Sequence, residues 1–171
     1  MTEAFWAEGT YGVQPPLTDE AVREAEALLG VRLPDALLDL LRVQNGGTVV
    51  GERSAFPTTE RTSWAPGHVP FDSLMGIGTT DRALSLLDTP YLVQEWGLPE
   101  PVVLLTGDGH TWIALDYRAG GEPSVVWLDA DDESEVPLAP DFRTFLDGLV
   151  PAERFEQPTK GSSEVSRRVS G

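Results

Sequence analysis

The chain has 171 residues, of which 40% are hydrophobic and none is cysteine, so we expect one domain that folds around its own core without disulfides. Its 28 acidic residues outnumber its 12 basic ones, which gives a net charge of −16 at pH 7. A chain this acidic lacks the basic surface that nucleic-acid binding requires, so we expect no nucleic-acid partner; the acidity is typical either of a very soluble protein or of one attracted to a basic partner.

Residues 1–16 are expected to form an N-terminal arm, because Gly9, Gly12 and two prolines interrupt any regular element there. The first eight residues lack the basic start and the apolar stretch of a signal peptide. No run of about 18 apolar residues occurs, so we expect neither a membrane span nor a membrane partner. These features predict a cytoplasmic protein.

A first helix is predicted after Thr18, which is a favoured N-cap residue, and it should end at Gly30. Small and aliphatic residues recur between them at helical spacing, and we expect this stripe to be buried: Ala21, Val22, Ala25, Leu28 and Leu29. Residues 31–33 form so short a link that the next helix should lie beside this one.

The second predicted helix begins at Pro34, which suits the first helical turn because proline leaves no bond unmade there. Asp35 places negative charge at the positive end of the helix dipole. Four leucines at helical spacing should form the buried face: Leu37, Leu38, Leu40 and Leu41. The Asn-Gly-Gly sequence at 45–47 can adopt the left-handed conformation that ends a helix.

Residues 48–96 give weaker signals. We expect a strand at 48–50, a long irregular loop over 51–70, which holds three prolines, and a returning strand at 71–77. A helix over roughly 81–96 follows, either continuous or in two pieces because Pro90 interrupts it. Its apolar face should consist of Ala83, Leu84, Leu87, Tyr91 and Leu92.

The second half is dominated by strands. Apolar runs at 102–105, 111–117 and 124–128 are separated by short turn-forming sequences, which predicts an antiparallel meander. An acidic loop at 129–135 should follow. A last helix near 140–149 opens at Pro140 and Asp141, with four side chains expected to face inward: Phe142, Phe145, Leu146 and Leu149.

These elements predict a single α+β domain over residues 17–150, with a central antiparallel sheet packed by N-terminal, middle and C-terminal helices. Residues 151–171 hold four bases and three acids among small polar residues, and we expect them to be a disordered polar tail.

Residues 33–47, from Leu-Pro-Asp-Ala-Leu-Leu to Gln-Asn-Gly-Gly, resemble the signature helix of the SUKH superfamily, the Smi/Knr-type proteins. The resemblance continues through Trp-Gly-Leu-Pro at 96–99, Gly-Asp-Gly at 107–109, a strand ending in Leu-Asp-Tyr and the Phe-x-x-Phe-Leu-x-x-Leu helix. It covers about residues 17–150 and implies a binding fold. Many bacterial members are immunity proteins that neutralise polymorphic toxins, whereas others, including the fungal founders, are regulatory scaffolds.

Catalytic motifs are lacking, so we expect no enzymatic activity and no cofactor. His110 is the best candidate for an acid or base, since Asp108 and Asp116 are near in sequence, but its glycine-rich turn favours an exposed turn histidine. The other histidine, His68, lies in the expected irregular loop. Neither histidine has the spacing of a metal ligand, and cysteine is absent, which argues against a zinc site.

Two further segments have a functional and a structural interpretation. The acidic loop could hold calcium, but Ser134 and Pro140 stand where a calcium loop needs glycine and glutamate; a solvated loop or a patch facing a partner are the alternatives. Gly76 and Gly78 precede a possible helix, as in a phosphate-binding loop, but the third glycine of such a loop is missing. A strand-to-helix turn is the simpler interpretation.

Two tryptophans on strands, Trp112 and Trp127, should lie in the core, although an open sheet face would expose them as anchors for a partner. Trp6 and Trp64 are in less regular segments and are the more plausible exposed aromatics.

The resemblance and the acidity predict a non-catalytic protein-binding module, most simply an immunity protein that neutralises a basic, nuclease-like toxin domain. A regulatory or scaffold protein without a toxin is the alternative, and a small-molecule binder that uses a groove on the sheet is a third. The residues expected to contact the partner are five acids on the rim of an acidic face and one aromatic residue: Asp129, Asp131, Asp132, Glu133, Glu135 and Trp64.

Overall fold

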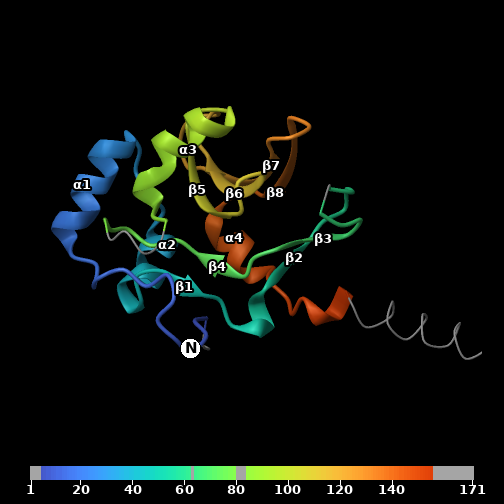
Figure 1. Ribbon diagram of the computed structural model, residues 1–171, viewed down its shortest axis with the longest axis horizontal. Coiled ribbons are helices and arrows are strands. Elements are labelled where there is room, and N and C mark those ends of the chain that lie inside the picture. Colours follow the sequence, from blue (N-terminus) through green and yellow to red (C-terminus); the bar gives the residue numbers. More distant parts are fainter. Residues whose placement is uncertain (1–4, 63, 80–83, 156–171) are drawn as a thin grey trace, which may run out of the picture.

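A computed structural model describes residues 5–62, 64–79 and 84–155 of the chain, and within these residues the fold is a single α+β domain with antiparallel sheets (Figure 1). The main sheet has the strand order β5-β6-β7-β8. Two short strand pairs, β1–β4 and β2–β3, lie beside it. The predicted fold class is therefore confirmed.

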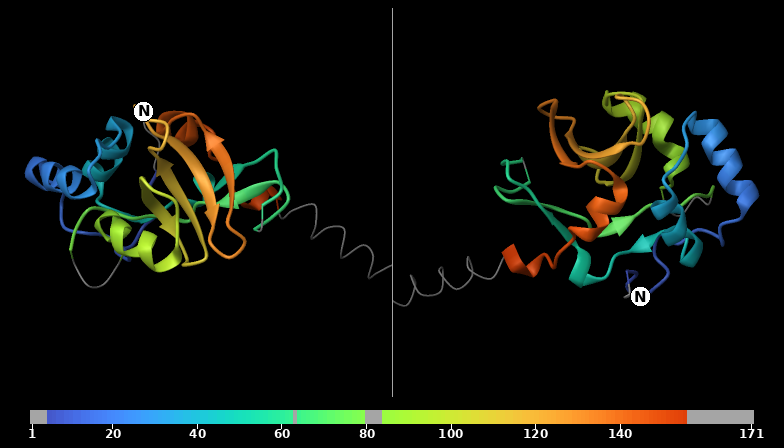
Figure 2. Two further views of the ribbon diagram at one scale, coloured as in Figure 1. Left: turned by 90° about the horizontal axis from the view of Figure 1, so that it is seen from above. Right: turned by 180° about the vertical axis from the view of Figure 1, so that it is seen from behind.

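The main sheet is a meander of β5 (Val102–Gly107), β6 (Thr111–Asp116), β7 (Ser124–Asp129) and β8 (Ser134–Ala139). Its first three strands are buried along nearly their whole length, which explains their continuous apolar runs. Figures 1 and 2 show α3 (Thr89–Trp96) beside β5, and α4 (Phe142–Asp147) between the main sheet and the β1–β4 pair. The core thus continues from the main sheet to both α3 and α4.

The acidic segment 129–135 is a tight hairpin turn rather than a loop. Residue Asp129 ends β7 and Ser134 already begins β8, so only residues 130–133 connect the two strands. Strand β8 was not predicted, and its sequence is interrupted by Pro137. A proline is acceptable on an edge strand, and β8 is the edge of the main sheet among the described residues.

Helix α1 (Asp19–Leu29) has the predicted ends. The Thr18 hydroxyl accepts a hydrogen bond from the backbone N–H of Ala21 at 3.1 Å, and Gly30 ends the helix with φ 74°. Its buried face is narrower than expected, because Val22 and Ala25 are buried whereas Leu28 is 56% exposed.

Helix α2 (Asp35–Val43) packs on α4 and buries three of the four predicted leucines, Leu37, Leu38 and Leu41, while Leu40 is half-buried. Two details of the prediction are wrong. Pro34 is the N-cap and not part of the first turn, and the helix ends at an extended Gln44 rather than at a left-handed residue. The positive φ angles at Gly46 and Gly47 turn the chain after the helix has ended.

The Asn45 side chain joins three distant segments in the interior. Its Nδ2 donates to the Pro15 carbonyl at 2.7 Å and to the Ile77 carbonyl at 2.8 Å, and its Oδ1 accepts from the Ile77 N–H at 2.8 Å. The Asn45 carbonyl accepts in addition from the Gln14 N–H at 2.8 Å. This network fixes the N-terminal segment and the segment after β4 against the end of α2, and we call it the Asn45 network.

The segment 51–70 is more regular than predicted. A 3₁₀ turn, η1 (Gly51–Arg53), leads into a hairpin of β2 (Ala55–Pro57) and β3 (His68–Pro70). The expected strands at 48–50 and 71–77 are reduced to the short pair β1 (Gly47–Thr48) and β4 (Ser73–Leu74). The hairpin was not predicted, because prolines at the ends of β2 and β3 are more typical of a loop.

The middle helix consists of two pieces, η2 (Leu86–Asp88) and α3, with Pro90 in the first turn of α3, where proline is tolerated. The expected start at 81 lies outside the described residues, as does Ala83. Leu92 is buried as predicted. Leu84 and Tyr91 are instead 47% and 64% exposed, which corrects the predicted apolar face.

Helix α4 begins as predicted, because the Asp141 carboxylate accepts from the Thr144 N–H at 2.8 Å, and this bond lowers the pKa of Asp141. Phe142, Phe145 and Leu149 are buried against the sheet. Both strand tryptophans are buried in the core, which confirms the preferred interpretation of Trp112 and Trp127. The assignments of residues 1–16 as an arm and 151–171 as a disordered tail stay predictions.

Candidate functional site

The candidate site is the end of the main sheet that carries residues 129–135, which we call the acidic turn. Asp131, Asp132 and Glu133 are exposed there, followed by exposed Glu135 on β8. Asp129 is only 5% exposed, so it does not lie on the rim as expected. Its carboxylate instead accepts the N–H groups of Asp131 at 2.9 Å and Asp132 at 3.4 Å and so shapes the turn.

The turn between β5 and β6 holds the acidic turn in place. The His110 carbonyl accepts from the Ala130 N–H at 2.7 Å, and the His110 ring Nδ1 lies 3.2 Å from Asp131 Oδ1. The ring of Trp96, at the end of α3, contacts the His110 ring edge-on with centroids 5.4 Å apart. The β5–β6 turn, the acidic turn and α3 therefore meet at His110. Hydrogen bonds there fix the backbone that carries the exposed acids.

His110 does not form the arrangement that acid–base chemistry would need. Its partner is Asp131 rather than Asp108 or Asp116, and its side chain is 56% exposed. The Asp108 carboxylate serves the turn by accepting from Thr111 and from the His110 N–H. Burial raises the pKa of Asp108, but these hydrogen bonds outweigh it and leave the pKa lowered, so Asp108 is an anion near neutral pH.

Arg118 clamps two acids at the other side of the acidic turn. Its guanidinium lies 2.9 Å from Asp116 Oδ1 and 2.7 Å from Glu135 Oε1. Its hydrogen bonds lower the pKa of both carboxyl groups and raise the pKa of Arg118. Glu135 is thus paired within the chain and contributes less free negative charge than the predicted site assumed.

We expect Arg118→Gln to lower the free energy of unfolding at pH 7 by at most about 1 kcal/mol, since the clamp is partly exposed. Both carboxyl groups have a lowered pKa in the folded state. Their contribution is therefore present above the unfolded pKa of about 4 and is lost as the pH falls through the folded pKa. Urea unfolding at pH 7 and pH 3 should show the difference from wild type shrinking on acidification.

The matched control for the clamp is Arg23→Gln, which removes an arginine on α1 that forms no ion pair among the described residues. This variant should match wild type at both pH values. If Arg118→Gln has the same free energy of unfolding as wild type at both pH values, the role assigned to Arg118 is wrong.

A hollow of ≈ 320 Å³ adjoins the acidic turn. The segment Gly97–Pro99 after α3 forms one wall, and residues 128–130 and 133–135 form the other. Its walls combine Leu98 and Pro99 with three acidic residues, Asp129, Glu133 and Glu135. Three of the predicted partner residues thus border one concave surface, whereas Asp131, Asp132 and Trp64 do not line it.

Trp64 lies elsewhere, in the connection between β2 and β3, and its side chain is 52% exposed as predicted. Figure 1 shows the β2–β3 and β7–β8 hairpins pointing away from α1. Trp6 is half-buried instead of exposed, because it bridges to Val49 and its indole N–H donates to the Leu40 carbonyl at 3.4 Å.

The remaining candidate sites have structural explanations. A Cβ on Gly76 would collide with the backbone carbonyl of Asn45, so this glycine permits close packing of two backbone segments. Among the described residues, no group of three potential metal ligands comes together, and no helix is long and apolar enough to cross a membrane. The role of the predicted partner residues stays a prediction.

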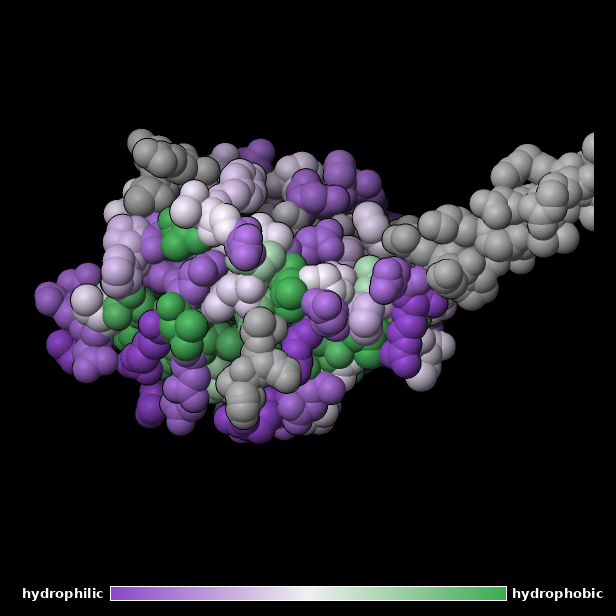
Figure 3. Space-filling model, turned by 90° about the horizontal axis from the view of Figure 1, so that it is seen from below, coloured by the Kyte–Doolittle hydropathy of each residue, from purple (hydrophilic) through white to green (hydrophobic). Residues whose placement is uncertain are grey.

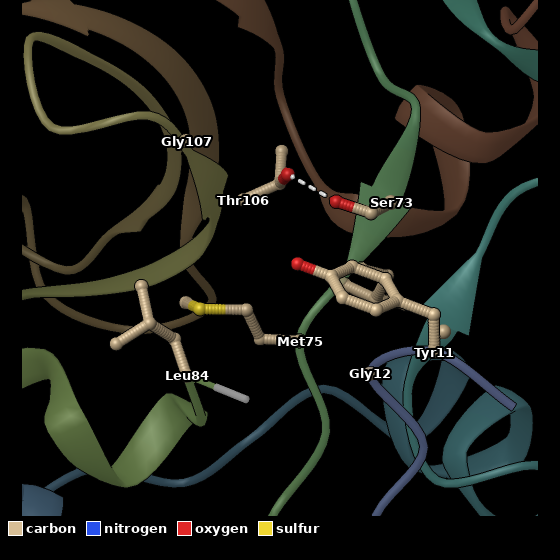
Figure 4. A pocket seen from close by; sticks show the side chains of 9 residues that line it. Tyr11, Gly12, Ser73, Met75, Leu84, Thr106 and Gly107 are labelled. Atoms are coloured by element: carbon tan, nitrogen blue, oxygen red, sulfur yellow. Dashed lines mark hydrogen bonds between the residues drawn. The ribbon is translucent and has the colours of Figure 1, made fainter. Parts of the chain in front are cut away.

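A second hollow, of ≈ 140 Å³, lies between the N-terminal segment, β4 and β5 (Figure 4). Tyr11 and Leu84 stand at its mouth, and Met75 lines it. This hollow was not predicted, because its residues come from five separate segments of the chain. The Arg118 clamp was not predicted either, although the sequence offers one signal, since Arg118 is the only lysine or arginine between residues 88 and 135.

A comparison with protein families matches residues 16–148 to the model of the SMI1 / KNR4 family (SUKH-1). No curated protein and no solved structure matches the chain.

Proposed function

The chain belongs to the SMI1 / KNR4 family (SUKH-1), and we propose on that basis that it is a non-catalytic protein-binding module, namely an immunity protein that neutralises a basic toxin domain. Family members are often immunity proteins. The match spans all elements from α1 to α4, so the proposal does not depend on the segments before residue 16 or after residue 148.

The observation that supports this proposal best is the set of exposed acids on the acidic turn. Asp131, Asp132 and Glu133 follow one another on a turn fixed by the buried Asp129 carboxylate and by the His110 carbonyl. A rigid group of carboxylates loses little entropy on binding and is suited to meet lysines and arginines. A nuclease toxin presents such residues where it binds phosphate groups.

The direct test is to look for a toxin gene directly upstream and to co-express the chain with the toxin domain that it encodes. We expect the chain to restore growth and to co-purify with that domain. If no toxin gene is adjacent, and the immobilised chain captures only a non-toxic protein from a lysate of its own organism, the immunity proposal is wrong and a regulatory role takes its place.

We expect the triple variant Asp131→Asn, Asp132→Asn, Glu133→Gln to associate with the toxin domain several-fold more slowly than wild type. Exposed charges mainly accelerate encounter and act over roughly 8–10 Å at ordinary salt. The salt dependence of association should flatten, whereas dissociation should change less. Stopped-flow binding at low and high salt measures both rates.

Asp129 and Glu135 are left intact in this variant because each stabilises the fold through its own partners. The matched control neutralises three other exposed acids, Glu20 and Glu24 on α1 and Asp39 on α2, and so removes the same net charge elsewhere. Equal slowing in both variants would show that net charge alone attracts the partner and would refute the role of the acidic turn.

A further inference from the structure

The hollow beside β4 presents apolar side chains that the fold does not use. Tyr11 is 81% exposed and Leu84 is 47% exposed, although large apolar side chains are normally buried. Figure 4 shows the Tyr11 ring, the Met75 thioether and the Leu84 side chain around one opening. Figure 3 shows that apolar residues on the underside of the molecule form separate patches among polar ones, so apolar surface is locally concentrated.

Several polar groups of the hollow are already paired with each other or with the backbone. The hydroxyl groups of Ser73 and Thr106 bond to each other at 3.1 Å, and the Met75 N–H donates to the Leu105 carbonyl at 2.9 Å. Glycines supply much of the remaining wall and add no side chains. An apolar group placed against these paired groups therefore breaks no hydrogen bond. The volume of ≈ 140 Å³ resembles the cavity of about 150 Å³ that holds benzene in an engineered protein.

Negative charge follows the hollow directly along the chain. Gly107 in its wall is followed directly by Asp108, an anion near neutral pH. The same β5–β6 turn is hydrogen-bonded to the acidic turn through the Ala130 N–H and the His110 carbonyl. The apolar hollow, Asp108 and the exposed acids of the acidic turn are thus consecutive along one end of the sheet. An apolar centre with a charged rim is the usual anatomy of a protein interface.

We propose that this hollow is the anchor site of the partner interface, and that it receives one aromatic or large aliphatic side chain flanked by arginine or lysine. The acidic residues that follow the hollow favour a basic flank on the partner. The paired hydroxyl groups in the wall of the hollow favour an apolar anchor. The inference rests on the proposed function only in naming the toxin domain as the source of this segment. Such a buried anchor would control dissociation, while the acidic turn controls association.

The site can be tested without the toxin by NMR of the full chain. The probes are three capped tripeptides, acetyl-Arg-Phe-Arg-amide, acetyl-Arg-Gly-Arg-amide and acetyl-Glu-Phe-Glu-amide. The first should shift the Gly107 amide and Met75 methyl signals most, and Leu84→Ser should reduce these shifts several-fold. Equal shifts with the glycine peptide, or largest shifts away from the hollow, would overturn the proposal.

The second test uses the toxin domain and matched variants. Tyr11→Ala and Leu84→Ser should accelerate dissociation about tenfold or more, whereas Leu28→Ser, which changes a leucine of similar exposure on α1, should match wild type. Urea midpoints verify that each variant is folded. If Tyr11→Ala and Leu84→Ser dissociate from the toxin domain at the wild-type rate, the anchor site is refuted and the proposed function is unaffected. If the tripeptide binds at the hollow but no toxin domain binds the chain, the anchor site is supported and the proposal of a toxin partner is refuted.

Discussion

Asn45→Ala is expected to lower the free energy of unfolding by about 3–5 kcal/mol. The Asn45 side chain is 2% exposed and makes three hydrogen bonds with the backbone at Pro15 and Ile77. Its removal leaves the carbonyl and N–H groups of Ile77 buried without these partners and takes the donor from the part-buried Pro15 carbonyl; each buried group costs roughly 1–3 kcal/mol, with incomplete additivity. Urea unfolding followed by tryptophan fluorescence measures the loss.

Asn45→Asp separates hydrogen-bond loss from cavity formation. The carboxylate keeps the acceptor for the Ile77 N–H but faces the carbonyl groups of Pro15 and Ile77, so burial should raise the pKa of this carboxyl group. Because a raised folded pKa stabilises only at low pH, the variant should recover part of its stability on acidification. Gln44→Ala removes the neighbouring amide, which donates to the Gly46 carbonyl and is half-buried, and should cost about 1 kcal/mol. Equal losses at positions 44 and 45 would contradict a special role for the Asn45 network.

Gly76→Ala should also be strongly destabilising, by at least about 3 kcal/mol. The added methyl group would collide with the Asn45 carbonyl group, which is backbone and cannot rotate away. The segment after β4 would have to move and would strain the Asn45–Ile77 hydrogen bonds. Differential scanning calorimetry should show a lower Tm and a smaller unfolding enthalpy.

The control for Gly76 is Gly67→Ala, in the β2–β3 connection, where an added Cβ meets nothing within 4 Å. That variant should remain within about 0.5 kcal/mol of wild type. If both alanine variants have the same stability, the close approach of Gly76 to Asn45 is not important for folding.

The parts of the fold that were predicted correctly are those with local causes. Thr18 and Asp141 cap helices through bonds to their own first turns, and the meander follows from apolar runs separated by turn residues. The leucines of α2 face the core because helical spacing alone places them on one side.

The parts that were missed depend on contacts between distant segments. Pro137 interrupts the sequence of β8, and only the position of this strand at the sheet edge makes the proline acceptable. Asp129 resembles its acidic neighbours in sequence, but the hairpin buries it and exposes the residues after it. The pairing of Arg118 with Glu135 spans 17 residues, and no local pattern specifies it.

The composition of β8 has a consequence for behaviour at high concentration. An open sheet edge invites another chain to add a strand, and this is a common start of aggregation. Pro137 removes one N–H donor from this edge, and exposed Glu135 places the charged Arg118 clamp beside it. A second copy that approached β8 would find an interrupted ladder and would have to desolvate an ion pair. The strand that completes the sheet therefore also protects the chain against self-association through that edge.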